Sequence, residues 1–163
     1  MKESTKIVKD NIVRALLKLM KKTPIDKISI CAIIDQAMVS RNSFYRHFVD
    51  KDDILRYYIS SETENWLRDT NMTYSKFGST HDYLIFLLEH LYKYRNVIEM
   101  MMRDNKMYLL EEEFDKRFKA ALSGISDPWH IAFTIGGFYK LFCYWAETGY
   151  EKTPQEIAEY VME

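Results

Sequence analysis

The stretch of the sequence most suited to chemistry is the short segment 41–47, which reads RNSFYRH. If this segment is helical, Phe44 lies on one face and Arg41, Asn42, Tyr45 and Arg46 lie on the opposite face. Such an outward face presents hydrogen-bonding groups along its whole length. This pattern indicates a helix that meets a polar partner.

Double-stranded DNA is the partner that suits this face best, because its major groove admits one α-helix. Side-chain geometry pairs Arg41 with a guanine and Asn42 with an adenine, which we treat as a hypothesis. Other side chains near this helix can hydrogen-bond phosphate oxygens instead. These are Ser40, Ser43, Tyr45, His47 and Lys51.

An alternative interpretation is that these are ordinary surface residues of a helical domain. His47 would then be a surface histidine, and Tyr45 would join its neighbour Phe44 in the core. DNA binding is favoured by the order of helix signals around the segment, which the alternative leaves unexplained.

The elements that position this segment are three predicted helices within residues 5–48. Apolar residues from 8 to 20 recur with helical spacing, and Thr23-Pro24 ends this first helix. Ser29 is a good N-cap for a second helix, and Ser40 is a good N-cap for the third. Two short helices joined by a tight turn form a helix-turn-helix unit.

Charge separates this part of the chain from the rest. Residues 1–51 hold eleven Lys or Arg and five Asp or Glu, a charge of +6, so the net charge of -1 leaves -7 for the remainder. This distribution suggests a basic module for a polyanion joined to an acidic module with another role. The two cysteines, Cys31 and Cys143, lie far apart in apolar runs, which predicts no disulfide and a reducing, cytoplasmic location.

Helical patterns continue to the C-terminus, and no alternating strand pattern is longer than four residues. The predicted caps are Asp50, Thr80, Asp127 followed by Pro128, and Thr153 followed by Pro154. We expect helices over 50–68, 80–94, 96–103, 108–122, 128–149 and from 153 onward, with a loop over 71–79. The predicted fold class is all-α, with a helix-turn-helix domain at 1–50 and a second helical domain at 51–163.

Residues 128–146 form a 19-residue stretch with few charges, which is long enough to raise the question of a membrane-spanning helix. Lys140 lies within it, and a lysine near the middle of a span costs roughly 2.5–3.5 kcal/mol. We therefore predict a buried helix there and no contact with a membrane.

The residue order around the second and third helices resembles the DNA-binding signature of the TetR family of bacterial transcriptional regulators. The residues that carry this resemblance are Ser29, Ile33, Ala37, Val39, Ser40, Phe44, Tyr45, His47, Phe48, Lys51 and Leu55. Met38 departs from the pattern, because the family usually has glycine in this turn. A left-handed backbone is costlier for methionine than for glycine, by roughly 1 kcal/mol.

The resemblance implies a two-domain helical homodimer that binds a DNA operator. Some positions match those that usually touch phosphates, namely Ser29, Ser40, Tyr45, His47 and Lys51. The base-reading positions correspond to Arg41, Asn42 and Ser43, and Arg46 lies on the same outward face. The expected function is that of a ligand-responsive repressor on a palindromic operator.

The resemblance also implies that residues 51–163 serve dimerisation and regulation. A dimer seam is expected along the apolar helix that contains Phe133, Gly137, Leu141 and Tyr144. A pocket for a small apolar or aromatic effector is expected among Trp66, Phe86, Tyr94, Met101, Phe114 and Phe118. The alternatives are an intramolecular contact for the seam and plain core packing for the aromatic residues.

Catalysis is not expected, because the sequence contains no G-x-S-x-G, H-E-x-x-H or phosphate-loop motif. No cofactor or metal is predicted, since no Cys/His cluster has ligand spacing. The competing function is a TetR-like co-activator or regulator that answers to a protein partner instead of a small molecule.

Overall fold

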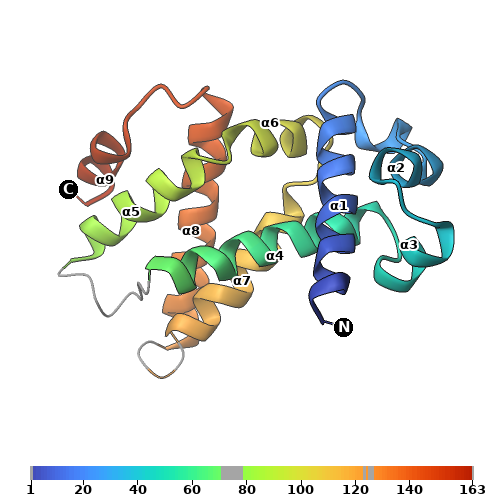
Figure 1. Cartoon of the computed structure of the whole chain (residues 1–163). Helices are drawn as coiled ribbons and strands as arrows, with labels where there is room; N and C mark the ends of the chain where they lie inside the picture. The colour runs from blue at the N-terminus through green and yellow to red at the C-terminus, as the bar shows by residue number, and fades with distance from the viewer. Residues whose placement is uncertain (1, 71–78, 123, 125–126, 163) are drawn as a thin grey trace. The chain divides into compact units, whose positions relative to one another are not determined.

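A computed structural model describes residues 2–70, 79–122, 124 and 127–162. Its elements are α1 (Lys2–Met20), the 3-10 turn η1 (Ile25–Lys27), α2 (Ile30–Ala37), α3 (Arg41–His47), α4 (Lys51–Thr70), α5 (Thr80–Tyr92), α6 (Arg95–Arg103), α7 (Tyr108–Leu122), α8 (Pro128–Glu147) and α9 (Pro154–Met162). The described residues contain no strand, so the predicted all-α class is confirmed (Figure 1). The predicted loop at 71–79 lies outside the described residues except for Ser79.

The chain divides into two compact units. The first unit contains residues 1–63 and 100–110, and the second contains residues 64–99 and 111–163. The first unit therefore includes a segment from the middle of the chain as well as the N-terminal helices. The residue boundaries between the units fall within the ranges of α4, α6 and α7.

Helix ends follow the capping residues that the sequence supplies. The Asp50 carboxylate accepts the Asp53 N–H at 2.8 Å, and the Asp127 carboxylate accepts the Trp129 N–H at 3.0 Å. At α9, Thr153 and Glu156 form the expected capping box: the Glu156 carboxylate accepts the Thr153 N–H at 2.7 Å, and the Thr153 hydroxyl accepts the Glu156 N–H at 3.2 Å. These three predicted caps are confirmed.

One predicted cap was wrong by a single residue. Ser79 is the N-cap of α5, since its hydroxyl accepts the Asp82 N–H at 3.1 Å, whereas Thr80 is the first helical residue. Serine and threonine are both good N-caps, so adjacent candidates cannot be ranked by residue type alone.

The core of the first unit is built from the apolar faces of α1 to α4. Fully buried side chains come from each of these helices and from η1: Ile12, Leu16, Met20, Ile25, Ile33, Phe44, Ile54 and Leu55. Helices α1, α2 and α3 pack against one another (Figure 1). This packing fixes α3, whose remaining face points away from the core.

The second unit is dominated by aromatic packing. Helix α5 packs on α9, and Gln155 donates to Glu89 at 3.0 Å between the two helices. The Phe114 ring contacts Phe138 and Phe142 of α8, with centroid distances of 5.4 and 6.1 Å. None of the helices in the described ranges is long and apolar enough to cross a membrane.

Candidate nucleic-acid interface

Helix α3 is divided into a buried face and an exposed face. Phe44 and Phe48 are buried, whereas Arg41, Asn42 and Arg46 are exposed. Tyr45 is 56% exposed, so it is a surface residue and not part of the core. The hydrogen-bonding side chains predicted to face outward therefore do so in the structure.

Two serine caps hold the N-terminal ends of α2 and α3. The Ser29 hydroxyl accepts the Ala32 N–H at 3.1 Å, and the Ser40 hydroxyl accepts the Ser43 N–H at 3.1 Å. A hydroxyl oxygen that accepts one hydrogen bond still has its own O–H to donate. Both serines are exposed, and each can cap its helix and donate to a phosphate oxygen at the same time.

The turn between α2 and α3 has the left-handed geometry suspected at Met38. Its backbone has φ 54° and ψ 46°. The Met38 N–H donates to Asp35 O at 3.3 Å, and the Val39 N–H donates to Ile34 O at 3.2 Å. These bonds satisfy the last carbonyls of α2, as in a Schellman-type ending. The turn therefore keeps the geometry that a glycine would adopt, with methionine in its place.

Arg41 makes a contact that joins the two helices. Its Nη2 donates to the Cys31 Sγ at 3.0 Å, and Cys31 is exposed. Cys31 is the second residue of α2, and Arg41 is the first residue of α3. The guanidinium is thus held beside the N-terminal ends of both helices.

Lys51 lies at the start of α4 but turns back toward η1. Its Nζ donates to the backbone carbonyls of Ile25 at 2.6 Å, Ile28 at 3.1 Å and Asp26 at 3.4 Å. An ammonium has three N–H donors, so a phosphate would have to compete with these carbonyls. The remaining flank residues, Ser43 and His47, are half-buried on α3.

A segment that sequence reasoning did not assign to this unit ties it together. The Asp104 carboxylate, which is buried, accepts the Ile25 N–H at 2.8 Å and is paired with Arg103 at 2.7 Å. Arg103 also donates to Met20 O at 2.9 Å, at the end of α1. No local signal could reveal these contacts, because they join residues about 80 positions apart.

A second pair of contacts fixes the start of α4. Lys106 and Asp52 form an ion pair at 3.0 Å, and the Tyr108 hydroxyl donates to the same carboxylate. Burial acts to raise the pKa of Asp52, but the hydrogen bonds from Tyr108 and Lys106 outweigh it and leave the pKa below its usual 3.8. For Asp104, burial is likewise outweighed by the hydrogen bonds from Arg103 and Ile25, and its pKa is also lowered.

The predicted dimer seam lies largely at the surface of the second unit. Phe133 is 79% exposed, Gly137 and Tyr144 are exposed, and Leu141 is half-buried. Trp129, one helical turn before Phe133, is 86% exposed. Among the residues that the structure describes, a Cβ added at Gly137 would meet nothing within 4 Å, so none of them makes a close contact that accounts for this glycine.

The predicted effector residues fall into separate groups. Trp66 stacks on Phe86 and on His90, with centroid distances of 5.0 and 4.0 Å, and His90 contacts Tyr94. Phe114 and Phe118 pack on each other and on Phe138. Met101 is buried and belongs to the first unit.

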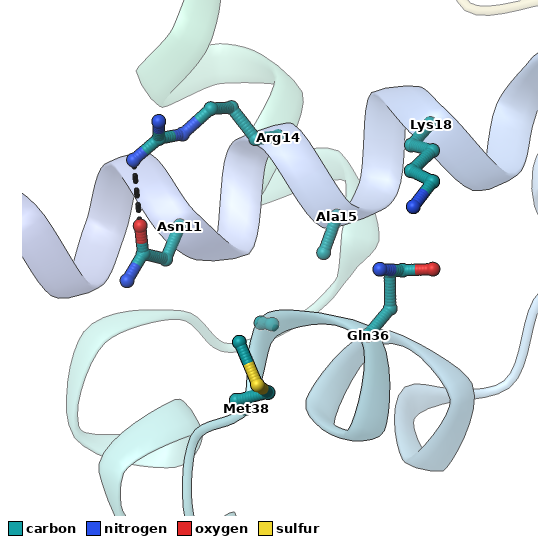
Figure 2. Close-up of a pocket in the computed structure, with 7 residues that line it drawn as sticks. Asn11, Arg14, Ala15, Lys18, Gln36 and Met38 are labelled. Carbon is teal, nitrogen blue, oxygen red and sulfur yellow. Dashed lines mark hydrogen bonds between the residues drawn. The ribbon is translucent and has the colours of Figure 1, made fainter.

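One pocket in the first unit has a cavity volume of about 200 Å³ and opens between α1 and the C-terminal end of α2. Figure 2 shows Asn11, Arg14 and Lys18 on α1 opposite Gln36 and Met38. None of the predicted DNA-contacting residues lines it. Among the residues with described positions, no group of His, Cys, Asp and Glu is arranged to hold a metal ion.

Comparison with known protein families gives a match over the helix-turn-helix region. Residues 12–58 match the model of a family described as bacterial regulatory proteins, tetR family. This range includes about the second half of α1, all of α2 and α3, and the first part of α4. No curated protein matches the chain.

Proposed function

We propose that this chain, whose residues 12–58 match the tetR family of bacterial regulatory proteins, is a DNA-binding transcription regulator of that type and a ligand-responsive repressor. In this proposal it binds a palindromic operator as a homodimer in the bacterial cytoplasm. The observation that carries the DNA-reading part is the exposed face of α3, where Arg41, Asn42 and Arg46 stand opposite the buried Phe44.

Each residue of the interface has a role in the proposal. Arg41 and Asn42, in the first turn of α3, read base edges together with Ser43, because the N-terminal residues of a recognition helix reach the bases. The phosphate contacts come from the side chains around them, namely Ser29, Ser40, Tyr45, His47 and Lys51, and Arg46 adds a positive charge on the same outward face. Lys51 can contribute only by giving up part of its bonding to the carbonyls of η1.

Support for a homodimer comes from α8. Its exposed Trp129, Phe133 and Tyr144 are large apolar side chains in one row along the helix, with the exposed Lys140 between Phe133 and Tyr144. Exposed apolar rows of this kind mark interaction surfaces in many proteins. A dimer would present two copies of α3 to half-sites about one helical turn, or a multiple of it, apart.

The ligand-responsive part of the proposal concerns the second unit. Trp66, Phe86 and Tyr94 in one group, and Phe114 and Phe118 in another, offer aromatic surface suited to an apolar or aromatic effector. An effector whose affinity is higher for the DNA-free protein than for the DNA-bound protein would weaken operator binding and release the DNA.

Selection of bound duplexes from a random DNA pool tests the function. The wild-type protein should retain a two-fold symmetric sequence, and its affinity should fall steeply as salt rises, because several phosphates are neutralised. Arg41→Ala and Asn42→Ala should each relax the preference at one base position and cost roughly 1–3 kcal/mol on the cognate site.

Asp35→Ala is the matched control, since Asp35 is exposed on α2 and outside the proposed contacts. Its selected sequence should equal that of the wild type. Equal loss of affinity on every sequence for the Arg41 and Asn42 variants would refute their base-reading roles. Failure of the wild type to retain any duplex at low salt would refute the proposed function.

A further inference from the structure

The contact between Arg41 and Cys31 has a consequence for how α3 reads DNA. The Arg41 Nη2 donates to the Cys31 Sγ at 3.0 Å, and both side chains are exposed. The contact joins the first turn of α2 to the first turn of α3. It therefore fixes a surface side chain and contributes nothing to the buried core.

We infer that Cys31 is a positioning residue for DNA recognition, whose sulfur holds the Arg41 guanidinium in the orientation that reads a guanine. This inference rests on the proposed function and names a residue that determines its specificity. Cys31 itself is not expected to touch the DNA. It acts through Arg41.

The entropy of the arginine side chain gives the physical reason. Arginine has several rotatable bonds, and ordering them on binding costs free energy. A contact that already exists in the free protein removes part of this cost before the DNA arrives. The Arg41 side chain would then meet the groove in a limited set of orientations.

The acceptor is suited to this task because it is weak and neutral. A thiol sulfur accepts only a weak hydrogen bond, so it orients the guanidinium without competing strongly with guanine O6 and N7. In the part of the chain that the structure describes, the Arg41 guanidinium contacts this neutral thiol and forms no ion pair with a carboxylate that the DNA would have to replace. The second hydrogen of Nη2 and the hydrogens of Nη1 remain for a bidentate contact.

Two substitutions at Cys31 separate the acceptor from the bulk of the side chain. Cys31→Ala removes the acceptor, whereas Cys31→Ser keeps an acceptor of similar size. Binding should be measured on two sets of DNA. The first is the operator that the wild type selects, and the second is the same operator changed at the one base that the Arg41→Ala protein no longer discriminates. We expect Cys31→Ala to lower discrimination at that base about threefold to tenfold, the value of one modest hydrogen bond, and Cys31→Ser to restore it.

A double-mutant cycle shows whether Cys31 acts through Arg41. In an Arg41→Ala background, Cys31→Ala should cause no further change at that base. Discrimination at the other operator positions should stay at the wild-type value in every Cys31 variant. Asp35→Ala on the same helix controls for general effects on α2, and all variants should retain the wild-type helical circular dichroism.

The outcomes of this experiment are distinct. Unchanged discrimination in Cys31→Ala, or an equal loss with and without Arg41, would overturn the inference and leave the DNA-binding function intact. A loss spread evenly over all operator positions would also overturn it. Absence of any selected operator for the wild type would instead refute the proposed function.

Discussion

Met38 is held in the left-handed region with its side chain 91% exposed. The left-handed conformation costs a residue with a Cβ roughly 1–2 kcal/mol of conformational free energy, whereas glycine adopts it without this cost. Met38→Gly should therefore raise the free energy of unfolding by about 1 kcal/mol, less the entropy that glycine adds to the unfolded chain. Urea unfolding followed by circular dichroism measures this change.

Asp35→Gly supplies the comparison for Met38, because it places glycine in the right-handed helix α2 only three residues away. Measured against Asp35→Ala, which removes the same charge, this substitution should lower stability by roughly 0.5–1 kcal/mol. If both substitutions destabilise, Met38 carries no conformational strain, and its side chain supports the turn in another way.

His90 is buried and stacked on Trp66, with 4.0 Å between the ring centroids. Burial, with a smaller contribution from the charge of Lys93, lowers the pKa of His90 from 6.5 to about 4. The folded state thus binds this proton less readily than the unfolded state. Its contribution to stability is complete above pH 6.5 and is lost as the pH falls toward 4, a loss of roughly 3 kcal/mol.

His90→Gln should remove most of this loss, so the slope of stability against pH between 6.5 and 4 should flatten. Unfolding curves at several pH values measure the slope. The change in tryptophan fluorescence that is lost in a Trp66→Phe variant reports on the His90 ring stacked against Trp66. His130→Gln is the matched control, because His130 is exposed on α8. An equal slope in the wild type and in His90→Gln would show that His90 is not the group responsible.

The segment from Arg103 to Tyr108 connects α6 and α7 and also fastens the first unit. Asp104→Ala would leave the buried Ile25 N–H without its acceptor, at a cost of roughly 1–3 kcal/mol. Because the pKa of Asp104 is lowered in the folded state, its stabilisation is present above pH 3.8 and disappears as the pH falls below that value. The variant should therefore be less stable at pH 7 and less sensitive to acid below pH 4.

Asp104→Asn keeps an oxygen acceptor and should lose less stability at neutral pH than Asp104→Ala. The exposed Asp69→Ala serves as the control, with an expected change within 0.5 kcal/mol. The measurement is again urea unfolding, repeated from pH 7 to pH 3. A neutral effect of Asp104→Ala at pH 7 would mean that the Ile25 N–H finds another acceptor.

Much of the helical architecture could be predicted from the sequence because helix ends depend on neighbouring residues. The predicted range of α7 coincides with the observed Tyr108–Leu122, and Pro128 and Pro154 open α8 and α9 as expected. The break between α5 and α6 lies two residues before the predicted one, since no strong cap marks it. Residues 100–110 could not be assigned to the first unit, because only contacts between distant positions place them there.

In the candidate interface too, features set by neighbouring residues could be predicted, whereas contacts between separate elements could not. The outward face of α3 follows from helical periodicity, and the caps at Ser29 and Ser40 follow from residue type. The bonds from Lys51 to the carbonyls of η1 and from Arg41 to Cys31 depend on how separate elements meet. Sequence reasoning gave these two residues a DNA contact but could not foresee their partners in the free protein.

The charged and the apolar parts of the surface lie in different parts of the chain. Residues 1–51 carry +6, which suits a polyanion, whereas the exposed apolar side chains of α8 suit another protein surface. Gly136 and Gly137 each cost about 1 kcal/mol in a helix, and the described residues leave open space around both. A second copy of α8 packed closely on this face would explain why glycine is present there.

Phe133→Glu tests this assembly, because Phe133 is 79% exposed and its replacement should leave the folded chain intact. A charge placed in a two-fold interface faces its own copy, so the variant should sediment as a monomer at micromolar concentrations at which the wild type is a dimer. Its affinity for the full palindromic operator should fall at least tenfold, while binding to a single half-site stays unchanged. Ile7→Glu, an exposed apolar position on α1, should leave sedimentation unaltered. A wild type that sediments as a monomer, or a Phe133→Glu protein that remains a dimer, would remove α8 from the dimer interface.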